Sequence, residues 1–355
     1  MRAALTEARR GVGRTAPNPP VGAVVVKDGT VVGKGHHAKA GLPHAEPMAL
    51  DDAGEAAKGA DLYVTLEPCC HHGRTPPCTE RIIAAGIRRV YYSTSDVTGD
   101  GIGGHAVLEQ AGIETEAGLL DDEAAEIYVP FNWHRRHSTP YGILKMAMTL
   151  DGKIGPAEPG QHWLTGDESR EYVHRLRNEC DAVMVGSVTA RVDDPQLNCR
   201  LPDGRDPVRV VVASKCDVAS RARAIKSDSD APCVVATTEL APMQLRTELE
   251  NAGAEVLVLP SDEGRVDLAS LWKALGQRGL LSVLIEGGPT LAASALEAGI
   301  VNKLALLYAP RIIGDVAARS AFGGPTGLSA EDVEVRSIEM LGPDILVEAY
   351  PCSRD

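Results

Sequence analysis

The chain has no uninterrupted apolar run of about 18 residues, the length that a membrane-spanning helix needs. Residues 1–11 also lack the apolar stretch of a secretory signal peptide. Positive charge is not in excess, because 36 Lys and Arg stand against 49 Asp and Glu, for a formal net charge of −13. Broad binding to nucleic acid relies on clustered cations. The sequence therefore predicts neither a membrane nor a nucleic-acid partner, although a few local cations could bind a small phosphorylated molecule.

The cysteines are too scattered for a dense disulfide framework. Eight are spread over 355 residues, whereas small disulfide-stabilised domains carry them at close, regular spacing. Reduced thiols, some of them holding a metal, explain this usage better. We therefore expect a cytoplasmic protein.

Two α/β domains are expected from the length and from the alternation of strand and helix patterns. A chain of 355 residues allows about two domains of about 150 residues each, and it shows no internal repeat and no low-complexity tract. We place the first domain at 1–138 and the second at 139–355. Residues 130–140, with two prolines and a basic, Ser/Thr-containing stretch, are predicted to form a linker.

Apolar periodicity and turn residues place the expected elements. Asp28-Gly29 predicts a hairpin turn, and Asp167 is a candidate N-cap. In the first domain we expect strands at 21–27, 31–35, 61–66 and 89–93, and helices at 3–10, 44–53, 80–85 and 107–111. In the second we expect strands at 143–148, 182–185, 208–212, 234–237, 255–259, 281–285 and 303–309, and helices at 169–178, 268–275 and 291–297.

Three short segments of the first domain together supply the parts of a catalytic zinc site. They are His44-Ala45-Glu46, Pro68-Cys69 and Pro77-Cys78. Zinc takes nitrogen and sulfur ligands, and a site with three protein ligands keeps one position for water. A non-ligating Glu can then move protons between that water and a leaving amine. The alternative is a closed structural site with Cys70, His71 or His72 as fourth ligand. Glu46 would have no role there, which favours catalysis.

The loop between the cysteines carries a possible anion site. It reads Cys-His-His-Gly-Arg-Thr-Pro-Pro over residues 70–77. Two His and an Arg beside a metal suggest binding of a substrate phosphate. The alternative is that these are ordinary solvated loop residues.

Two features of the second domain suggest ligand contacts, and the first of them suggests a dinucleotide. A predicted strand ends in Glu286-Gly287-Gly288 and leads into a helix, whose free N–H groups and dipole attract phosphate. A tight turn could require the same glycines for geometry alone. Lys145 lies in an otherwise apolar strand and is either an edge-strand residue reaching solvent or a cation facing a ligand.

The motifs resemble those of one family. Residues 15–29, 44–50 and 64–87 resemble the deaminase half of the bifunctional riboflavin-biosynthesis deaminase/reductases, including a P-C-x8-C loop with the sequence HHGRTPPC. Residues 144–154, 162–166, 173–200, 285–291 and 308–314 resemble the reductase half. The resemblance implies an α/β fold with a cytidine-deaminase-like three-layer domain followed by a dihydrofolate-reductase-like domain.

For the first domain, the resemblance implies a metal site and a substrate site. Zinc would be bound by His44, Cys69 and Cys78, with Glu46 as the proton shuttle. Cys70 offers a second thiol beside Cys69, but Pro68 favours Cys69 as the ligand. The implied substrate contacts are Asn18, His37, His71 and Arg74.

For the second domain, the resemblance implies catalytic roles for Lys145 and Glu286, with Glu286 also contacting the substrate ribose. The implied cofactor contacts are Met148, Trp163, Thr189, Asp193, Ser214, Gly287, Gly288, Pro289 and Thr290. The further implied substrate contacts are Gln161, Arg177, Leu197 and Arg200, where the two Arg would clamp the substrate phosphate.

The family relationship implies a hydrolytic deamination and then an NADPH-dependent reduction of a phosphorylated ribosylaminopyrimidine, in a homo-oligomer that is a dimer or a tetramer. The cofactors would be zinc and NADPH. Two alternatives stay open from the residues alone. One is a deaminase of another base with an unrelated C-terminal domain, and the other is a zinc module without catalysis.

Overall fold

The computed structural model describes residues 1–72, 76–96, 103–155, 163–323 and 332–352. The chain divides into two compact units, Met1–His137 and Ser138–Asp355. No helix in the described ranges combines the length and the apolarity that crossing a bilayer requires.

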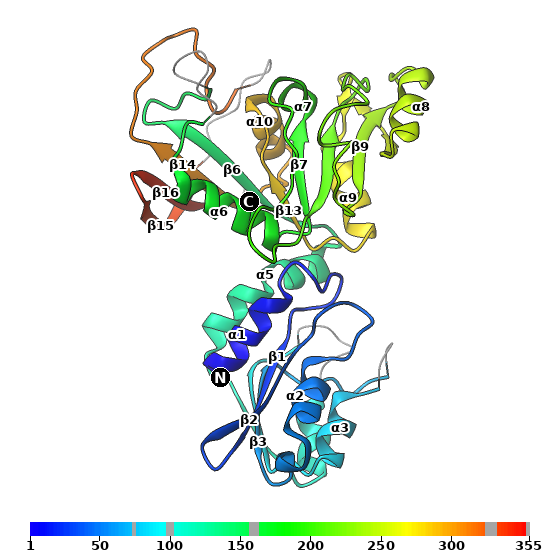
Figure 1. Ribbon diagram of the computed structural model, residues 1–355, viewed down its shortest axis with the longest axis vertical. Helices are drawn as coiled ribbons and strands as arrows, with labels where there is room; N and C mark the ends of the chain where they lie inside the picture. The colour runs from blue at the N-terminus through cyan, green and yellow to red at the C-terminus, as the bar shows by residue number, and fades with distance from the viewer. Residues whose placement is uncertain (73–75, 97–102, 156–162, 324–331, 353–355) are drawn as a thin grey trace. The chain divides into compact units, whose positions relative to one another are not determined.

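The N-terminal unit is built on a five-stranded sheet in the order β2-β1-β3-β4-β5 (Figure 1). β1 pairs antiparallel with β2 and β3, whereas β3, β4 and β5 run parallel. The predicted hairpin turn is present, since Asp28 and Gly29 adopt φ angles of 49° and 78°. The strands are β1 (Gly22–Lys27), β2 (Thr30–His36), β3 (Asp61–Leu66), β4 (Arg89–Thr94) and β5 (Glu114–Ala117).

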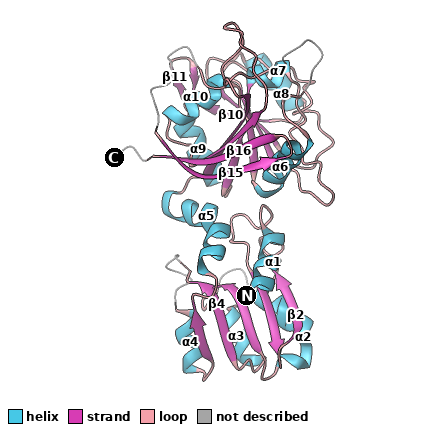
Figure 2. Cartoon of the chain, turned by 90° about the vertical axis from the view of Figure 1, so that its left-hand side faces the viewer, coloured by secondary structure: helices cyan, strands magenta, loops and turns pink. Residues whose placement is uncertain are grey.

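Helices cover both faces of this sheet and make three layers (Figure 2). On one face Leu50, Ile82 and Leu108 pack against the strands in the larger core. On the other, Leu5 and Tyr128 form a smaller core. The helices are α1 (Arg2–Gly11), α2 (Ala45–Ala53), a 3₁₀ turn (Gly54–Ala57), α3 (Cys78–Ala84), α4 (Gly104–Gln110) and α5 (Asp121–His137).

The predicted linker at 130–140 is wrong over most of its length. α5 continues through Pro130 and ends at His137. Proline lacks a backbone N–H and removes one helical hydrogen bond. The buried side chains of Tyr128 and Phe131 flank Pro130 and anchor the helix against the rest of the unit, so packing outweighs the local cost.

The C-terminal unit contains a nine-stranded sheet in the order β10-β9-β8-β7-β13-β6-β14-β16-β15. The strands from β10 to β14 are parallel, and β16 and β15 extend the sheet in antiparallel pairing. The strands are β6 (Tyr141–Thr149), β7 (Ala182–Gly186), β8 (Val208–Val212), β9 (Cys233–Thr238), β10 (Glu255–Leu259), β13 (Ser282–Ile285), β14 (Lys303–Ala309), β15 (Val333–Leu341) and β16 (Asp344–Pro351), with a separate hairpin of β11 (Ser261–Asp262) and β12 (Arg265–Val266).

Two apolar cores hold the helices to the two faces of this sheet. Trp272, Leu275 and Leu291 belong to one core, and Leu176 and Leu249 belong to the other. The helices are α6 (Asp167–Glu179), α7 (Ser187–Val192), α8 (Met243–Asn251), α9 (Leu268–Gln277) and α10 (Pro289–Glu297). Of these elements the sequence did not predict β11, β12, β15, β16, α7 and α8.

The prediction of Asp167 as an N-cap is also wrong. Gly166 occupies the N-cap position of α6, and Asp167 is the first helical residue. Asp344 of β16 supplies the acceptor instead, because its Oδ2 accepts from the Gly166 N–H at 2.7 Å and from the Ser169 hydroxyl at 2.6 Å. A carboxylate far away in sequence therefore satisfies the backbone N–H of the N-cap residue.

Candidate active sites

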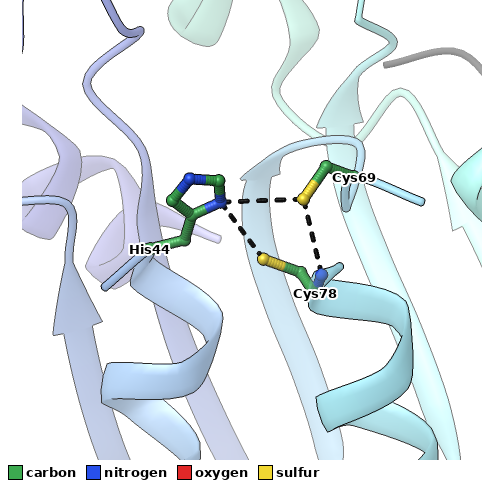
Figure 3. A group of neighbouring side chains, drawn as sticks. All are labelled: His44, Cys69 and Cys78. Atoms are coloured by element: carbon green, nitrogen blue, oxygen red, sulfur yellow. Dashed lines mark hydrogen bonds between the residues drawn. The ribbon is translucent and has the colours of Figure 1, made fainter. Parts of the chain in front are cut away.

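The three predicted metal ligands lie together in the N-terminal unit (Figure 3). His44 precedes the first turn of α2, Cys69 follows β3, and Cys78 begins α3. The His44 Nδ1 atom lies 3.6 Å from the Cys69 sulfur and 3.3 Å from the Cys78 sulfur. A tetrahedral zinc with bonds of about 2.3 Å to sulfur and about 2.0 Å to nitrogen separates such atoms by about 3.6 Å. The donor set and its spacing fit zinc.

Hydrogen bonds already favour a thiolate in this cluster. The Cys78 thiol lowers the pKa of the Cys69 thiol, burial opposes the change, and His44 adds to the lowering. The backbone N–H of Cys78 also donates to the Cys69 sulfur at 3.4 Å. Because the thiolate is the form that binds metal, Cys69 is prepared as a ligand.

Glu46 is buried beside the cluster without belonging to it. Burial raises the pKa of its carboxyl to about 7, the charge of Cys69 adds to this, and His44 opposes it. A carboxyl that titrates near neutral pH can both accept and donate a proton. This is the property that the predicted proton shuttle requires.

A cavity of about 350 Å³ opens in front of these residues and is lined by the predicted substrate contacts Asn18, His37 and His71. The buried ring of His37 lies 3.0 Å from the Pro43 carbonyl oxygen through Nδ1 and 3.1 Å from the Asn18 amide nitrogen through Nε2. A proton on Nδ1 satisfies both contacts, with Nε2 accepting from Asn18. This pair holds the Asn18 amide in a fixed orientation at the cavity wall.

The cavity also has lining residues that the sequence analysis did not single out. Phe131, His134 and Arg135 come from the end of α5, the segment that was predicted to be a linker. The signal that could have identified these residues is the group of basic side chains, including His134 and Arg135, in the last turn of a helix. The predicted contact Arg74 lies outside the described residues.

Glu67 was missed as well and joins the cysteine loop to α4. Its buried Oε1 atom accepts from the backbone N–H of Gly103 at 3.2 Å, and from the backbone and the ring Nδ1 of His105 at 3.1 and 2.8 Å. Beside it, a Cβ on Gly104 would come within 1.8 Å of the Pro68 carbonyl oxygen. The loop that carries Cys69 is thus fastened to the start of α4.

A larger cavity, of about 940 Å³, lies in the C-terminal unit at the carboxyl ends of the parallel strands. Open α/β sheets bind ligands at this edge. Many of the predicted residues line it, namely Lys145, Thr189, Asp193, Ser214, Glu286, Gly287, Gly288, Pro289 and Thr290.

The glycine turn in this cavity is built for close approach. A Cβ on Gly288 would lie 3.1 Å from the Thr189 hydroxyl, and one on Gly287 would lie 3.1 Å from Leu291. Gly288 is the N-cap of α10, with Pro289 at its first position. The free N–H groups of α10 therefore start at the cavity wall, where the phosphates of a dinucleotide fit.

Lys145, Glu286 and Arg177 form a charged group beside this turn. β6 lies between β13 and β14, so the edge-strand explanation for Lys145 is wrong. Burial lowers the pKa of Lys145, and Glu286 opposes the change. Burial would raise the pKa of Glu286, but the charge and the hydrogen bonds of Arg177 outweigh it and lower that pKa.

Arg177 and Arg200, which were predicted to clamp the substrate phosphate, both make hydrogen bonds within the protein. The Arg177 guanidinium is bonded to Glu286 and to the Asn198 carbonyl oxygen. Arg200 is exposed, and its Nε donates to His174 at 3.1 Å. Burial, together with Arg177 and Arg200, lowers the pKa of His174 to about 4, so this residue, absent from the predictions, is neutral at pH 7. Leu197 is buried with φ of 57°.

Two predicted cofactor contacts do not reach the cavity wall with their side chains. Met148 is buried in the core of the sheet. Trp163 is 55% exposed and carries the Arg170 guanidinium over its ring, 5.5 Å from the centroid. The predicted substrate contact Gln161 lies outside the described residues.

Comparisons with known proteins identify a zinc-binding deaminase region and a reductase domain. A family model described as the cytidine and deoxycytidylate deaminase zinc-binding region matches residues 1–94, and one described as the RibD C-terminal domain matches residues 140–347. The chain is 41% identical to the riboflavin biosynthesis protein RibD of Aquifex aeolicus over 344 residues, covering 96% of this chain and 91% of that protein. It is 39% identical to RibD of Actinobacillus pleuropneumoniae over 356 residues, covering 98% and 93%.

Solved structures give the same result over nearly the full length. A diaminohydroxyphosphoribosylaminopyrimidine deaminase/5-amino-6-(5-phosphoribosylamino)uracil reductase from Thermotoga maritima superposes with a TM-score of 0.85 at 35% identity, covering 99% of this chain and 97% of that one. RibD of Acinetobacter baumannii also gives a TM-score of 0.85, at 34% identity, covering 99% and 97%.

The fold and the two sites define a bifunctional enzyme that joins a zinc-binding deaminase domain to a dihydrofolate-reductase-like reductase domain. The chain belongs to the RibD family of riboflavin-biosynthesis deaminase/reductases. The match along nearly the whole chain excludes an unrelated C-terminal domain, and membership of an enzyme family excludes a zinc module without catalysis.

Proposed function

We propose that the N-terminal domain hydrolyses the 2-amino group of 2,5-diamino-6-(ribosylamino)-4(3H)-pyrimidinone 5′-phosphate and releases ammonia. The C-terminal domain then reduces the ribosyl chain with NADPH, giving 5-amino-6-(5-phosphoribitylamino)uracil. The observation that carries the first step is the buried Glu46 carboxyl in one cavity with the His/Cys/Cys cluster and the Asn18–His37 pair. The activities in the name of the Thermotoga maritima relative support both steps.

In the deaminase domain, His44, Cys69 and Cys78 would hold zinc, which when bound supplies a Lewis acid that activates water for attack on the ring carbon. Glu46 takes a proton from that water and returns it to the departing amine, so that ammonia leaves and a carbonyl remains. Its pKa of about 7 suits both transfers. Asn18, held by His37, presents its amide to the pyrimidine edge.

In the reductase domain, the turn at Gly287 and Gly288 and the Thr189 hydroxyl would hold the cofactor pyrophosphate. NADPH, when bound there, supplies the hydride for C1′ of the ribosyl chain. Lys145 and Glu286 face the same cavity. The lowered pKa of Lys145 makes it the better proton donor of the two, while Glu286 is held ionised by Arg177 and accepts hydrogen bonds from the ribose hydroxyls.

For the substrate phosphate in the reductase domain, Arg200 is the stronger candidate of the two predicted Arg residues. It is exposed, and its Nε donates to His174. Arg177 would reach a phosphate only by giving up part of its bonding to Glu286. We therefore assign Arg200 to the phosphate and Arg177 to the orientation of Glu286.

We also propose a cytoplasmic homo-oligomer that forms through the edge strand β15. Four apolar side chains of this strand are 41% to 67% exposed, namely Val333, Val335, Ile338 and Met340. A bulge between Val335 and Ser337 keeps them on one face. A second copy of the same strand is the self-complementary partner for such a face. Light scattering should find a dimer or tetramer, and Ile338→Lys should shift it to monomer; a wild-type monomer contradicts the proposal.

The central experiment combines purified protein, the diaminopyrimidine phosphate and either NADPH or NADH, following ammonia and nicotinamide absorbance together. We expect ammonia release without any nicotinamide, and NADPH oxidation that follows deamination. A chelator should stop ammonia release but leave reduction of the deaminated intermediate intact. Release of ammonia from cytosine or guanine at a comparable rate, or no oxidation of either nicotinamide, contradicts the proposed function.

A further inference from the structure

The loop that carries Arg200 is fastened to one face of α6. His174 and Arg177 lie three residues apart on this helix, so they share a face. The His174 ring donates a hydrogen bond to the backbone carbonyl of Asn198, which also accepts from the Arg177 Nη1 at 3.0 Å. The Cys199 thiol donates to the His174 carbonyl oxygen at 3.5 Å. His174 therefore contacts both of the residues that precede Arg200.

The same ring also contacts Arg200 itself. The Arg200 Nε donates to the His174 Nε2 at 3.1 Å, and the Arg200 backbone nitrogen lies 3.3 Å from Nδ1. A neutral imidazole accepts through one nitrogen only, so acceptance at Nε2 leaves Nδ1 with the proton that the Asn198 carbonyl receives. One ring therefore orients the backbone of the loop and the guanidinium of Arg200.

Arg177 and Arg200 are held by groups of different charge. Glu286 holds Arg177 through two hydrogen bonds, and its negative charge balances that of the guanidinium. His174 holds Arg200 and is neutral at pH 7, because burial, together with Arg177 and Arg200, lowers its pKa to about 4. The group that holds Arg200 therefore leaves its positive charge intact.

The charges that reach Arg200 are mostly positive as well. The pKa of Arg200 is lowered, first by burial and then by three neighbouring cations, whereas Glu286 opposes the change. The cations are Arg177, Arg223 and Arg170. Glu286 lines the larger cavity, so this positive region lies beside the place where the substrate ribose is proposed to bind. Such a region favours an anion, in a protein whose net charge is −13.

We infer that His174 is a positioning residue of the reductase domain, which holds Arg200 in place for the substrate phosphate without cancelling its charge. A carboxylate in the place of His174 would bind the guanidinium more strongly, but it would also compete with the phosphate for it. A neutral acceptor orients the side chain and keeps its charge for the ligand. The inference rests on the proposed function, in which Arg200 binds the phosphate.

Kinetics of the reductase step test the inference with two substrates, the deaminated intermediate and its dephosphorylated form. His174→Ala should raise KM for the phosphorylated substrate about tenfold and leave kcat nearly unchanged, while kcat/KM for the dephosphorylated substrate stays the same. His174→Gln keeps a neutral acceptor and should recover much of the loss. His174→Glu keeps an acceptor but adds a negative charge, so it should raise KM at least as much as His174→Ala.

Calorimetric titration with the same two compounds, without a nicotinamide, should show the same pattern in Kd. Arg175→Ala is the matched control, since it removes an exposed cation at the next position of α6, and it should match wild type. An unchanged KM in His174→Ala, an equal loss with both substrates, or wild-type behaviour of His174→Glu overturns the inference if Arg200→Ala raises KM. A wild-type KM in Arg200→Ala overturns the proposed phosphate contact itself and the inference with it.

Discussion

Arg177 on α6 and Glu286 after β13 form a bidentate ion pair, with Nε to Oε1 at 2.5 Å and Nη2 to Oε2 at 2.8 Å. Their side chains are only 11% and 8% exposed. The remaining Arg177 nitrogen, Nη1, donates to the Asn198 carbonyl oxygen at 3.0 Å. One guanidinium therefore fixes the carboxylate that faces the cofactor cavity and also the loop that carries Arg200.

Arg177→Ala should destabilise the reductase domain strongly. It leaves the buried Glu286 carboxylate without the two hydrogen bonds of the guanidinium, and removal of one partner of a buried pair costs about 3–5 kcal/mol. Urea unfolding of wild type and variant measures the change. Arg175→Ala on the same helix is the control, since its pair with Glu171 is exposed and should contribute at most about 1 kcal/mol. Equal losses in the two variants would contradict a special role for the Arg177–Glu286 pair.

Glu46→Gln should lower ammonia release about 10²- to 10⁴-fold, the usual effect of losing a positioned acid or base. The His44, Cys69 and Cys78 side chains are untouched, so zinc content by elemental analysis should equal that of wild type, and reduction of the deaminated intermediate should continue. Glu55→Gln, an exposed position after the same helix, should behave as wild type. Deamination surviving at more than a few per cent would show that Glu46 is not the proton shuttle.

Lys145→Ala should have the converse effect. Reduction should fall sharply, because the proton donor beside Glu286 is lost, while ammonia release persists. The loss of NADPH absorbance with the deaminated intermediate measures reduction, and an ammonia assay measures deamination. Loss of both activities would instead indicate misfolding or tight coupling between the domains.

Glu67→Ala should weaken zinc binding about 10- to 100-fold, the range found when a group that supports metal ligands is removed. Three donors from the start of α4 lose their acceptor, and the loop carrying Cys69 is released. Competition with a chromogenic chelator reports the affinity. Glu67→Gln keeps an acceptor oxygen and should retain more zinc affinity than Glu67→Ala. Glu109→Ala changes an exposed position on α4 and should leave the zinc affinity unchanged. Unchanged zinc affinity in Glu67→Ala would remove the assigned role.

His174 should make the reductase domain less stable in mild acid. Burial, with Arg177 and Arg200, lowers its pKa from 6.5 to about 4, so the unfolded chain binds more protons than the folded one between these values. Its contribution is therefore complete above about pH 6.5 and is lost as the pH falls towards 4. Urea titrations from pH 7 to pH 4 should show a shallower decline for His174→Gln than for wild type. Parallel curves would mean that His174 does not titrate as described.

Local sequence predicts the elements that depend on short-range rules. The apolar, β-branched run at 21–27 and the Asp28-Gly29 turn predict the first hairpin, and the structure confirms it. The metal cluster was found for the same reason, because each ligand lies in a short motif with its own local constraint. The start of α5 was missed because its apolar positions are sparse and Pro130 argues against a helix.

Contacts between distant segments were not predictable in the same way. Arg177 and Glu286 are 109 positions apart, and Glu67 and His105 are 38 apart. The residues that flank each of these positions in the sequence do not indicate which distant residue it binds. Arg177 and Glu286 meet because β13 lies between β7 and β6 in the sheet, out of chain order. Glu67 and His105 meet because β3 and β4 lie side by side and α4 follows β4.

By itself, the sequence determined the two α/β domains, the chemistry of the metal ligands with Glu46, and the glycine turn, since motif spacing and periodicity act over a few residues. Only the tertiary structure decided that Arg177 binds Glu286 and that Glu67 fastens the cysteine loop. Tertiary packing brings these residues together, because it depends on how apolar faces of the whole chain are buried together rather than on any local stretch.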